Sequence, residues 1–73
     1  MPKYFFNVRN HVDTKDFDGR ELLNLVEATR EAQLDIADIM RARFETIGNW
    51  SRWSIDICDD KGLLLKTVPF SSN

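Results

Sequence analysis

The stretch Asn24–Gly48, NLVEATREAQLDIADIMRARFETIG, carries the pattern that decides the fold. At about 100° per residue, its apolar residues fall on one arc of a helix: Leu25, Ala28, Ala32, Ile36, Ile39, Met40, Phe44 and Ile47. Asn24 can accept a hydrogen bond from the first-turn amides, with Glu27 three residues further on, as in a capping box. Gly48 can take the left-handed conformation that ends a helix. The pattern therefore predicts one long amphipathic helix that buries its apolar arc.

The segment before the helix predicts two strands and a turn. Alternation over Lys3–Arg9 indicates a half-buried strand whose inner face carries Tyr4, Phe6 and Val8. We expect the chain to return as a short second strand over Val12–Asp16. The residues Asp16-Phe17-Asp18-Gly19 form a turn signal, after which the chain leads into the helix.

The segment after the helix predicts a hairpin whose register follows from its loop. Asp59-Asp60-Lys61-Gly62 suits a type I turn in which Gly62 is left-handed. Counting outward gives these opposite pairs: Cys58 with Leu64, Ile57 with Leu65, Asp56 with Lys66, Ile55 with Thr67, and Trp53 with Pro69.

This register assigns each side chain of the hairpin to a face. The helix-facing side chains are Trp53, Ile55, Ile57 and Leu65. Asp56 and Lys66 become an opposite-charge pair on the outer face, which also carries Cys58, Leu64 and Val68. Pro69 suits the end of an edge strand because it cannot donate to a ladder.

Together these elements predict an α+β fold with two layers. A four-stranded antiparallel sheet carries one long helix on one face, in the order β-β-α-β-β. The 73 residues suit a single domain, residues 1–73. Because a domain of this size buries only about 60% of its unfolded surface, we expect it to self-associate, as a homodimer.

Charge and cysteine content narrow the class of protein. The net charge is −2 and the ten Lys and Arg residues are scattered, so nucleic-acid binding is not indicated. Acidic residues of the helix form a stripe that repels phosphate and suits a basic protein partner: Glu27, Glu31, Asp35 and Asp38. No apolar run is long enough to cross a membrane. With a single cysteine, Cys58, and no signal-peptide pattern in residues 1–10, we expect a cytoplasmic protein.

The sequence predicts no catalytic residue, no cofactor and no metal site. One loop gathers potential ligands: His11, Asp13, Asp16 and Asp18. Aligning Gly19 with the invariant glycine of a calcium loop puts Thr14 and Leu25 where carboxylates are needed, so the match fails. Neighbouring aspartates raise the pKa of Cys58 and so do not activate its thiol. With one His and one Cys, the inventory favours a protein that is not an enzyme.

Apolar residues outside the expected core are candidates for partner binding. On the helix these are Leu34, Phe44 and Ile47, next to Trp50, and on the outer sheet face they are Phe5 and Leu64. A helix ending at Ile47 would be about 34 Å long, longer than the strands, so its end overhangs the sheet. A second copy could cover this overhang, which we favour over the sheet face, or Trp50 and Trp53 could fold back within one chain.

Short motifs along the chain also carry a resemblance. They are Met1-Pro2-Lys3-Tyr4-Phe5-Phe6-Asn7-Val8-Arg9, Asp16-x-x-Gly19-x-Glu21-Leu22, Ala28-x-x-Glu31-Ala32, Trp53-x-Ile55-x-Ile57 and Val68-Pro69-Phe70. In this order they resemble a family of small bacterial proteins of unknown function, whose members often carry His where this chain has Asn7. That resemblance implies a shared fold, and it does not assign an activity. The layout is also distantly similar to HicB-type antitoxin domains.

From these observations we expect a small non-enzymatic protein-interaction or regulatory domain, whose partner is another protein or a second copy. The alternative is an antitoxin-like regulator that binds nucleic acid.

Overall fold

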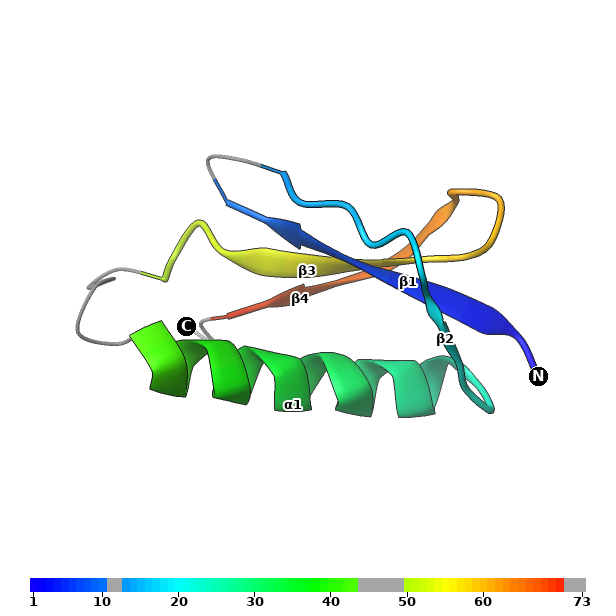
Figure 1. The fold of residues 1–73 in the computed structure, drawn as a ribbon, viewed down its shortest axis with the longest axis horizontal. Coiled ribbons are helices and arrows are strands. Elements are labelled where there is room, and N and C mark those ends of the chain that lie inside the picture. Colours follow the sequence, from blue (N-terminus) through cyan, green and yellow to red (C-terminus); the bar gives the residue numbers. More distant parts are fainter. Residues whose placement is uncertain (11–12, 44–49, 71–73) are drawn as a thin grey trace.

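The fold has two layers, a four-stranded sheet and one helix that covers one of its faces (Figure 1). The computed structural model describes residues 1–10, 13–43 and 50–70. Its elements are β1 (Lys3–Arg9), β2 (Arg20–Glu21), α1 (Leu25–Arg43), β3 (Ser54–Cys58) and β4 (Leu64–Pro69). All strand pairs are antiparallel, in the order β2-β1-β3-β4. The predicted α+β fold and its β-β-α-β-β order are confirmed.

The start of α1 follows the sequence signal. The side-chain oxygen of Asn24 accepts a hydrogen bond from the Glu27 N–H at 3.0 Å, and its carbonyl accepts one from the Ala28 N–H at 3.1 Å. Asn24 therefore caps the helix, as predicted. The other end of the predicted helix, with Phe44, Ile47 and Gly48, lies outside the described residues.

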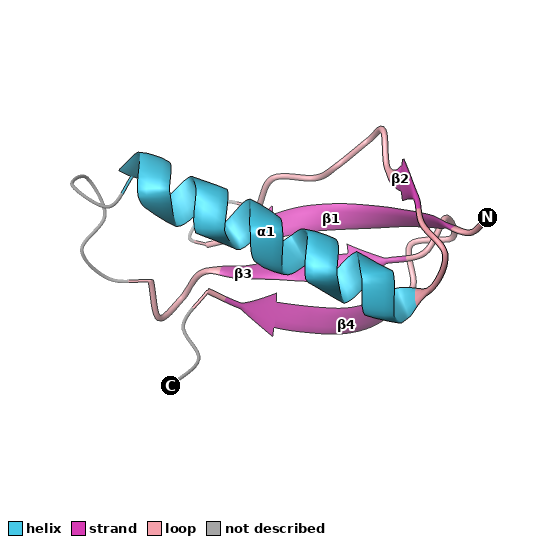
Figure 2. Cartoon of the chain, turned by 90° about the horizontal axis from the view of Figure 1, so that it is seen from below, coloured by secondary structure: helices cyan, strands magenta, loops and turns pink. Residues whose placement is uncertain are grey.

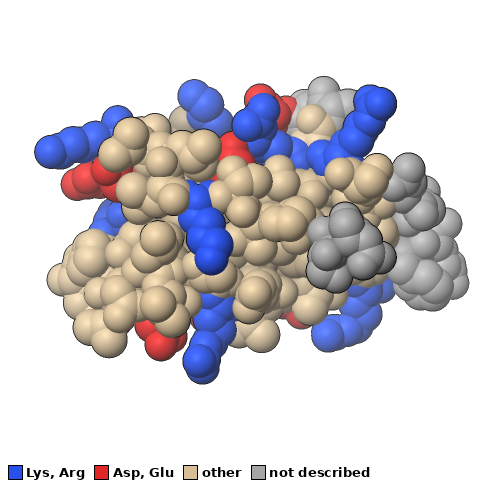
Figure 3. Space-filling model, turned by 180° about the vertical axis from the view of Figure 1, so that it is seen from behind, with Lys and Arg blue, Asp and Glu red and all other residues tan. Residues whose placement is uncertain are grey.

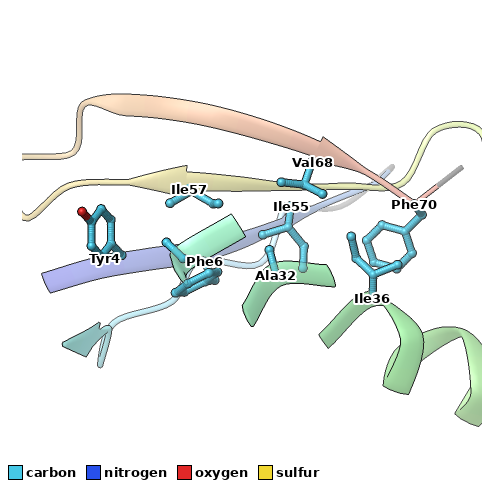
Figure 4. Close-up of a cluster of buried hydrophobic side chains, with 9 residues drawn as sticks. Tyr4, Phe6, Ala32, Ile36, Ile55, Ile57, Val68 and Phe70 are labelled. Carbon is cyan, nitrogen blue, oxygen red and sulfur yellow. The ribbon is translucent and has the colours of Figure 1, made fainter. Parts of the chain in front are cut away.

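The core lies between α1 and the middle of the sheet, as Figure 4 shows. Ala28 and Ala32 have no exposed surface, and these small side chains let the helix backbone approach β3 closely. Opposite them, Ile55 and Ile57 are the largest fully buried side chains. The other buried apolar residues are Tyr4, Phe6, Ile36, Val68 and Phe70. The predicted arc of the helix is confirmed as far as Met40, because Leu25, Ile39 and Met40 also pack against this core.

An aromatic cluster closes the core at the end of β4. Trp50 stacks on Phe70 with ring centroids 5.5 Å apart, and Trp53 meets Trp50 edge-on at 5.0 Å. The Phe70 N–H donates to the Trp53 carbonyl at 3.0 Å, which fixes the chain beside it. Trp50 and Trp53 are thus packed within one chain, the second of the two arrangements expected from the sequence.

The second strand is not where the sequence predicts it, so the expectation for Val12–Asp16 was wrong. Among the described residues of that segment, 13–16, only Thr14 forms a bridge with β1, opposite Val8. The strand that pairs with β1 on this side is β2, with Lys3 opposite Glu21 and Tyr4 opposite Arg20. Between these two contacts a side chain, in place of a strand backbone, accepts a hydrogen bond from β1: the Phe6 N–H donates to the Asp16 carboxylate at 3.1 Å. The alternation of apolar residues cannot reveal that a side chain takes the place of a strand.

The register of the β3–β4 hairpin is also partly wrong. The loop forms as predicted, with Gly62 at φ 83° and Cys58 opposite Leu64, but a β-bulge follows at Leu65. Every later pair is shifted by one residue, so that Ile57 lies opposite Lys66, Asp56 opposite Thr67, Ile55 opposite Val68, and Ser54 opposite Pro69.

The bulge reverses the faces predicted for β4. Val68 is buried in the core, whereas Leu65 is 37% exposed, and Lys66 moves to the helix side. The predicted pair of Asp56 and Lys66 therefore does not form. Pro69 ends β4, which is an edge strand, as predicted.

Substituting the two left-handed glycines tests the turn geometry. Gly62→Ala should lower the free energy of unfolding by about 1 kcal/mol, because a Cβ is disfavoured at positive φ although the space around it is open. Gly19→Ala should cost more, because φ is 72° and the new Cβ would lie 2.9 Å from the Phe5 ring. Urea denaturation measures both, with Lys61→Ala as the control in the same loop. Equal costs for the two glycines would contradict this geometry.

Candidate interaction surfaces

The Asp16 carboxylate fastens the loop between β1 and β2 to the sheet. One of its oxygens accepts the Phe6 N–H at 3.1 Å, and the other accepts the N–H groups of Asp18 and Gly19, both at 3.1 Å. The Asp16 N–H in turn donates to the side-chain oxygen of Asn7 at 2.9 Å. Asp16 and Asn7 therefore replace a stretch of backbone ladder with side-chain hydrogen bonds.

These contacts set the charge state of Asp16. Burial acts to raise the pKa of its carboxyl, but the hydrogen bonds from Gly19, Phe6 and Asp18 and the charge of Arg20 outweigh it. The pKa of Asp16 is therefore below its ordinary value, and the folded state favours the carboxylate. Both oxygens are already engaged with backbone donors, so the group that the sequence placed in a possible metal loop has a structural role.

Cys58 lies under the same network on the outer face. It is buried, and the side-chain nitrogen of Asn7 lies 3.6 Å from its sulfur. Burial raises the pKa of its thiol, and the negative charges of Asp56 and Asp59 raise it further. This direction agrees with the sequence, and the thiol is a weak nucleophile at neutral pH.

Asp56 is the buried charge of the outer face, and it has two partners there. One oxygen accepts a hydrogen bond from Arg9 at 3.1 Å, and the other accepts one from the Thr67 hydroxyl at 2.9 Å. Because Arg9 is half-exposed, it can reach Asp13 as well, at 3.7 Å. Arg9 and Thr67 thus take the place that the sequence assigned to Lys66, which the bulge has moved to the other face.

The acidic stripe of α1 is partly neutralised within the chain. Arg20 donates to Asp35 at 2.6 Å and to Glu31 at 3.3 Å, while its guanidinium lies 4.6 Å from the centroid of the Phe6 ring. The hydrogen bond to Asp35 is the largest cause that raises the pKa of Arg20. Two members of the stripe are therefore used to fasten β2 to the helix, which weakens the case for a basic partner on this flank.

Apolar side chains gather on the outer face at the hairpin end of the sheet. We call Phe5, Phe17 and Leu64 the outer patch. Phe17 is 85% exposed and Leu64 50%. Phe5 lies opposite Cys58, which lies opposite Leu64, so one rung of the sheet runs through the patch. Two of the predicted partner-binding residues, Phe5 and Leu64, are brought together here.

The remaining predicted partner-binding residues lie elsewhere. Leu34 is 56% exposed on the solvent side of α1, and Trp50 belongs to the aromatic cluster. Phe44 and Ile47 are outside the described residues. Sequence reasoning missed Phe17, because a lone apolar residue in a turn gives no periodic signal.

A shallow hollow of ≈ 360 Å³ lies beside the outer patch. Phe5, Phe17 and Cys58 line it together with Lys15 and three carboxylates, those of Asp16, Asp59 and Asp60. Across residues 1–10, 13–43 and 50–70 no group of three or more His, Cys, Asp or Glu side chains is arranged to hold a metal ion. His11, one of the candidate ligands, lies outside these ranges.

The amino-acid sequence matches the model of a known protein family. A family model described as a domain of unknown function (DUF6894) matches residues 3–71. The chain belongs to the DUF6894 family. Searches of curated proteins and of solved structures find no match. No helix in the described part of this DUF6894 domain is long and apolar enough to cross a membrane.

Replacing Asp16 tests whether its carboxylate holds the loop to β1. Asp16→Asn should lower the free energy of unfolding at pH 7 by about 1–3 kcal/mol, because an amide NH₂ replaces an oxygen that faces a backbone N–H. A lowered folded-state pKa contributes stability above the unfolded value of about 3.9, and this contribution is lost as the pH falls through the folded value. The difference from wild type should therefore shrink below about pH 4. Denaturant titrations from pH 7 to pH 2.5 measure it.

Asp18→Asn is the matched control, because the Asp18 side chain is exposed and lies two residues away in the same turn. Asp18→Asn should change the free energy of unfolding little at any pH. A difference for Asp16→Asn that stays constant down to pH 2.5 would show that the carboxylate is not what holds the loop.

We expect no divalent metal to bind this loop with useful affinity, because the Asp16 oxygens are engaged by backbone donors. Calorimetric titration with calcium and with zinc tests this expectation. A dissociation constant below about 10 μM that Asp16→Asn abolishes would mean that the ion displaces those hydrogen bonds.

Proposed function

We propose that this DUF6894 domain is a small, non-enzymatic protein-interaction domain that works as a homodimer. The observation that carries the proposal is the outer patch, whose three apolar side chains lie on the face of the sheet away from α1. Figure 1 shows that no helix covers this face in the described part of the chain. Exposed apolar groups gathered in one place are typical of interaction surfaces. The single cysteine of the sequence suits a cytoplasmic role.

The charges around the outer patch suit a second copy. Lys3 and Lys15 lie beside Phe5 and the hollow, and Asp59 and Asp60 line the same hollow. In a two-fold interface both copies use the same patch of surface, and each residue contacts a different residue of that patch on the partner. A rim that carries both signs of charge can therefore pair with itself. The patch therefore fits its own copy, and the proposed interface moves from the helix overhang to the sheet face.

The same charges argue for a protein partner over nucleic acid. Asp16, Asp59 and Asp60 all line the hollow beside the two aromatic rings, where a base would have to stack. Their carboxylates repel the phosphates that such a ligand brings. The antitoxin-like alternative therefore finds less support on this face.

A non-enzymatic role fits the side chains of this face. Cys58 is its candidate nucleophile, and burial and two aspartates raise the pKa of its thiol. The side chain that hydrogen-bonds its sulfur is the amide of Asn7, which cannot act as a general base.

Sedimentation equilibrium at about 50 μM tests the homodimer. The wild-type chain should sediment as a dimer, and Leu64→Ser and Phe17→Ser should shift it to the monomer mass, because each removes an apolar anchor. Leu34→Ser is the matched control, since Leu34 is 56% exposed and Leu64 is 50% exposed, and Leu34 lies on the helix. A monomeric wild type would remove the dimer. Dissociation by Leu34→Ser alone would move the interface to the helix.

A further inference from the structure

Strand β4 forms an open edge of the sheet. In the described part of the chain it pairs with β3 on one side only, and Figure 2 shows it outermost, opposite to β2. All its residues except Val68 are exposed. The backbone groups along such an edge can form a ladder with an added strand.

A groove runs beside this edge, between α1 and β4. It consists of two hollows of ≈ 350 Å³ and ≈ 400 Å³ that share Gln33 and so adjoin along the helix. Lys66 lines the first hollow, and Val68 and Phe70 line the second. A strand added to β4 would direct every second side chain into this groove.

The charge of the groove has one sign. Arg30 and Lys66 are the charged residues among those that line it, and both are basic and exposed. The acidic residues Glu31 and Asp35 point to the other flank of α1, where Arg20 holds them. From the β4 side the surface is mostly uncharged, and its basic side chains are more prominent than its acidic ones (Figure 3). A carboxylate on the added strand would complement this groove.

The charge of the groove opposes a second copy at this edge. The bulge at Leu65 and Pro69 limit the ladder to the residues between them for any added strand, so the choice of occupant rests on charge. An antiparallel second copy would bring its own Arg30 and Lys66 to this edge. Like charges would then face each other, and the residues that line the groove include no carboxylate to neutralise them.

We propose that the β4 edge and its groove bind an extended segment of another protein by strand addition. In this segment apolar side chains that enter the groove alternate with outward polar ones, and a carboxylate faces Arg30 and Lys66. No residue of the outer patch lines the groove, although Leu64 of the patch belongs to β4.

Three pools of labelled nine-residue peptides serve as the probe. Threonine occupies the outward positions, mixtures of valine, leucine and phenylalanine occupy the groove-facing positions, and the central groove-facing residue is glutamate, glutamine or lysine. Fluorescence anisotropy with the full chain should show the glutamate pool binding about fivefold more tightly than the glutamine pool, with the lysine pool weakest. Methylation of the backbone nitrogens should abolish binding, because it removes the ladder donors.

Charge reversal locates the binding to the groove. Lys66→Glu should reverse the preference, so that the lysine pool binds best, and Lys66→Gln should remove most of the difference between the pools. Lys61→Glu is the control, since it makes the same charge change in the exposed hairpin loop. Thermal unfolding verifies that each variant is folded, and Lys66 is exposed enough for both changes to be tolerated.

Three results would overturn the proposal: no binding of any pool at 1 mM peptide, equal affinity for the three pools, or a preference that Lys66→Glu leaves unchanged. Self-association that depends on Lys66, without peptide binding, would assign the edge to a second copy and would overturn it as well. Phe17→Ser should leave peptide binding intact. A failure at the β4 edge is thereby distinguished from a failure of the homodimer at the outer patch.

Discussion

The structure depends on how closely α1 approaches β3. Ala28 and Ala32 have no exposed surface, and the buried Ile55 and Ile57 fill the space beneath them. With one helix and one sheet there is a single layer of contact, so larger residues at the alanines would separate the two layers along their whole length. Every other part of the molecule is arranged around this contact: β1 and β4 flank β3, and the aromatic cluster closes the end.

The charged residues divide the molecule into two unlike flanks. On the β2 side, Arg20 joins the strand to Glu31 and Asp35, so that charge is used for internal cohesion. On the β4 side, Arg30 and Lys66 line an open groove that has no carboxylate among its lining residues. One flank is thus satisfied by the chain itself, and the other is suited to an outside ligand. The outer face differs from both, because its hollow carries both signs of charge.

Periodic features of the fold could be predicted from the sequence. The alternation of Lys3–Arg9, the cap at Asn24 and the left-handed Gly62 each rest on one local rule, and the structure has all three. The errors arose where a single residue breaks the period. One extra residue at Leu65 moved Val68 into the core and Lys66 to the helix side, and no residue type marks a bulge in advance. Likewise, Asp16 takes the place of strand backbone through its side chain, which a strand pattern cannot reveal.

The candidate surfaces were predictable in part for the same reason. Phe5 and Leu64 could be named because alternation assigns them a face, whereas Phe17 lies in a turn where no period applies. The basic groove beside β4 could not be named at all, since the bulge that brings Lys66 to the helix side gives no signal in the sequence.

The fastening of β1 by Asp16 and Asn7 also limits how these molecules can assemble. A sheet that grows by adding strands without end needs a usable edge on both sides of each subunit. Here the side of β1 away from β3 is filled by side-chain hydrogen bonds and by β2, which has only two residues. The edge opposite β4 is therefore the two-residue β2, which is too short to template a full strand, so a ribbon of stacked sheets, the route to a fibre, cannot readily continue from it.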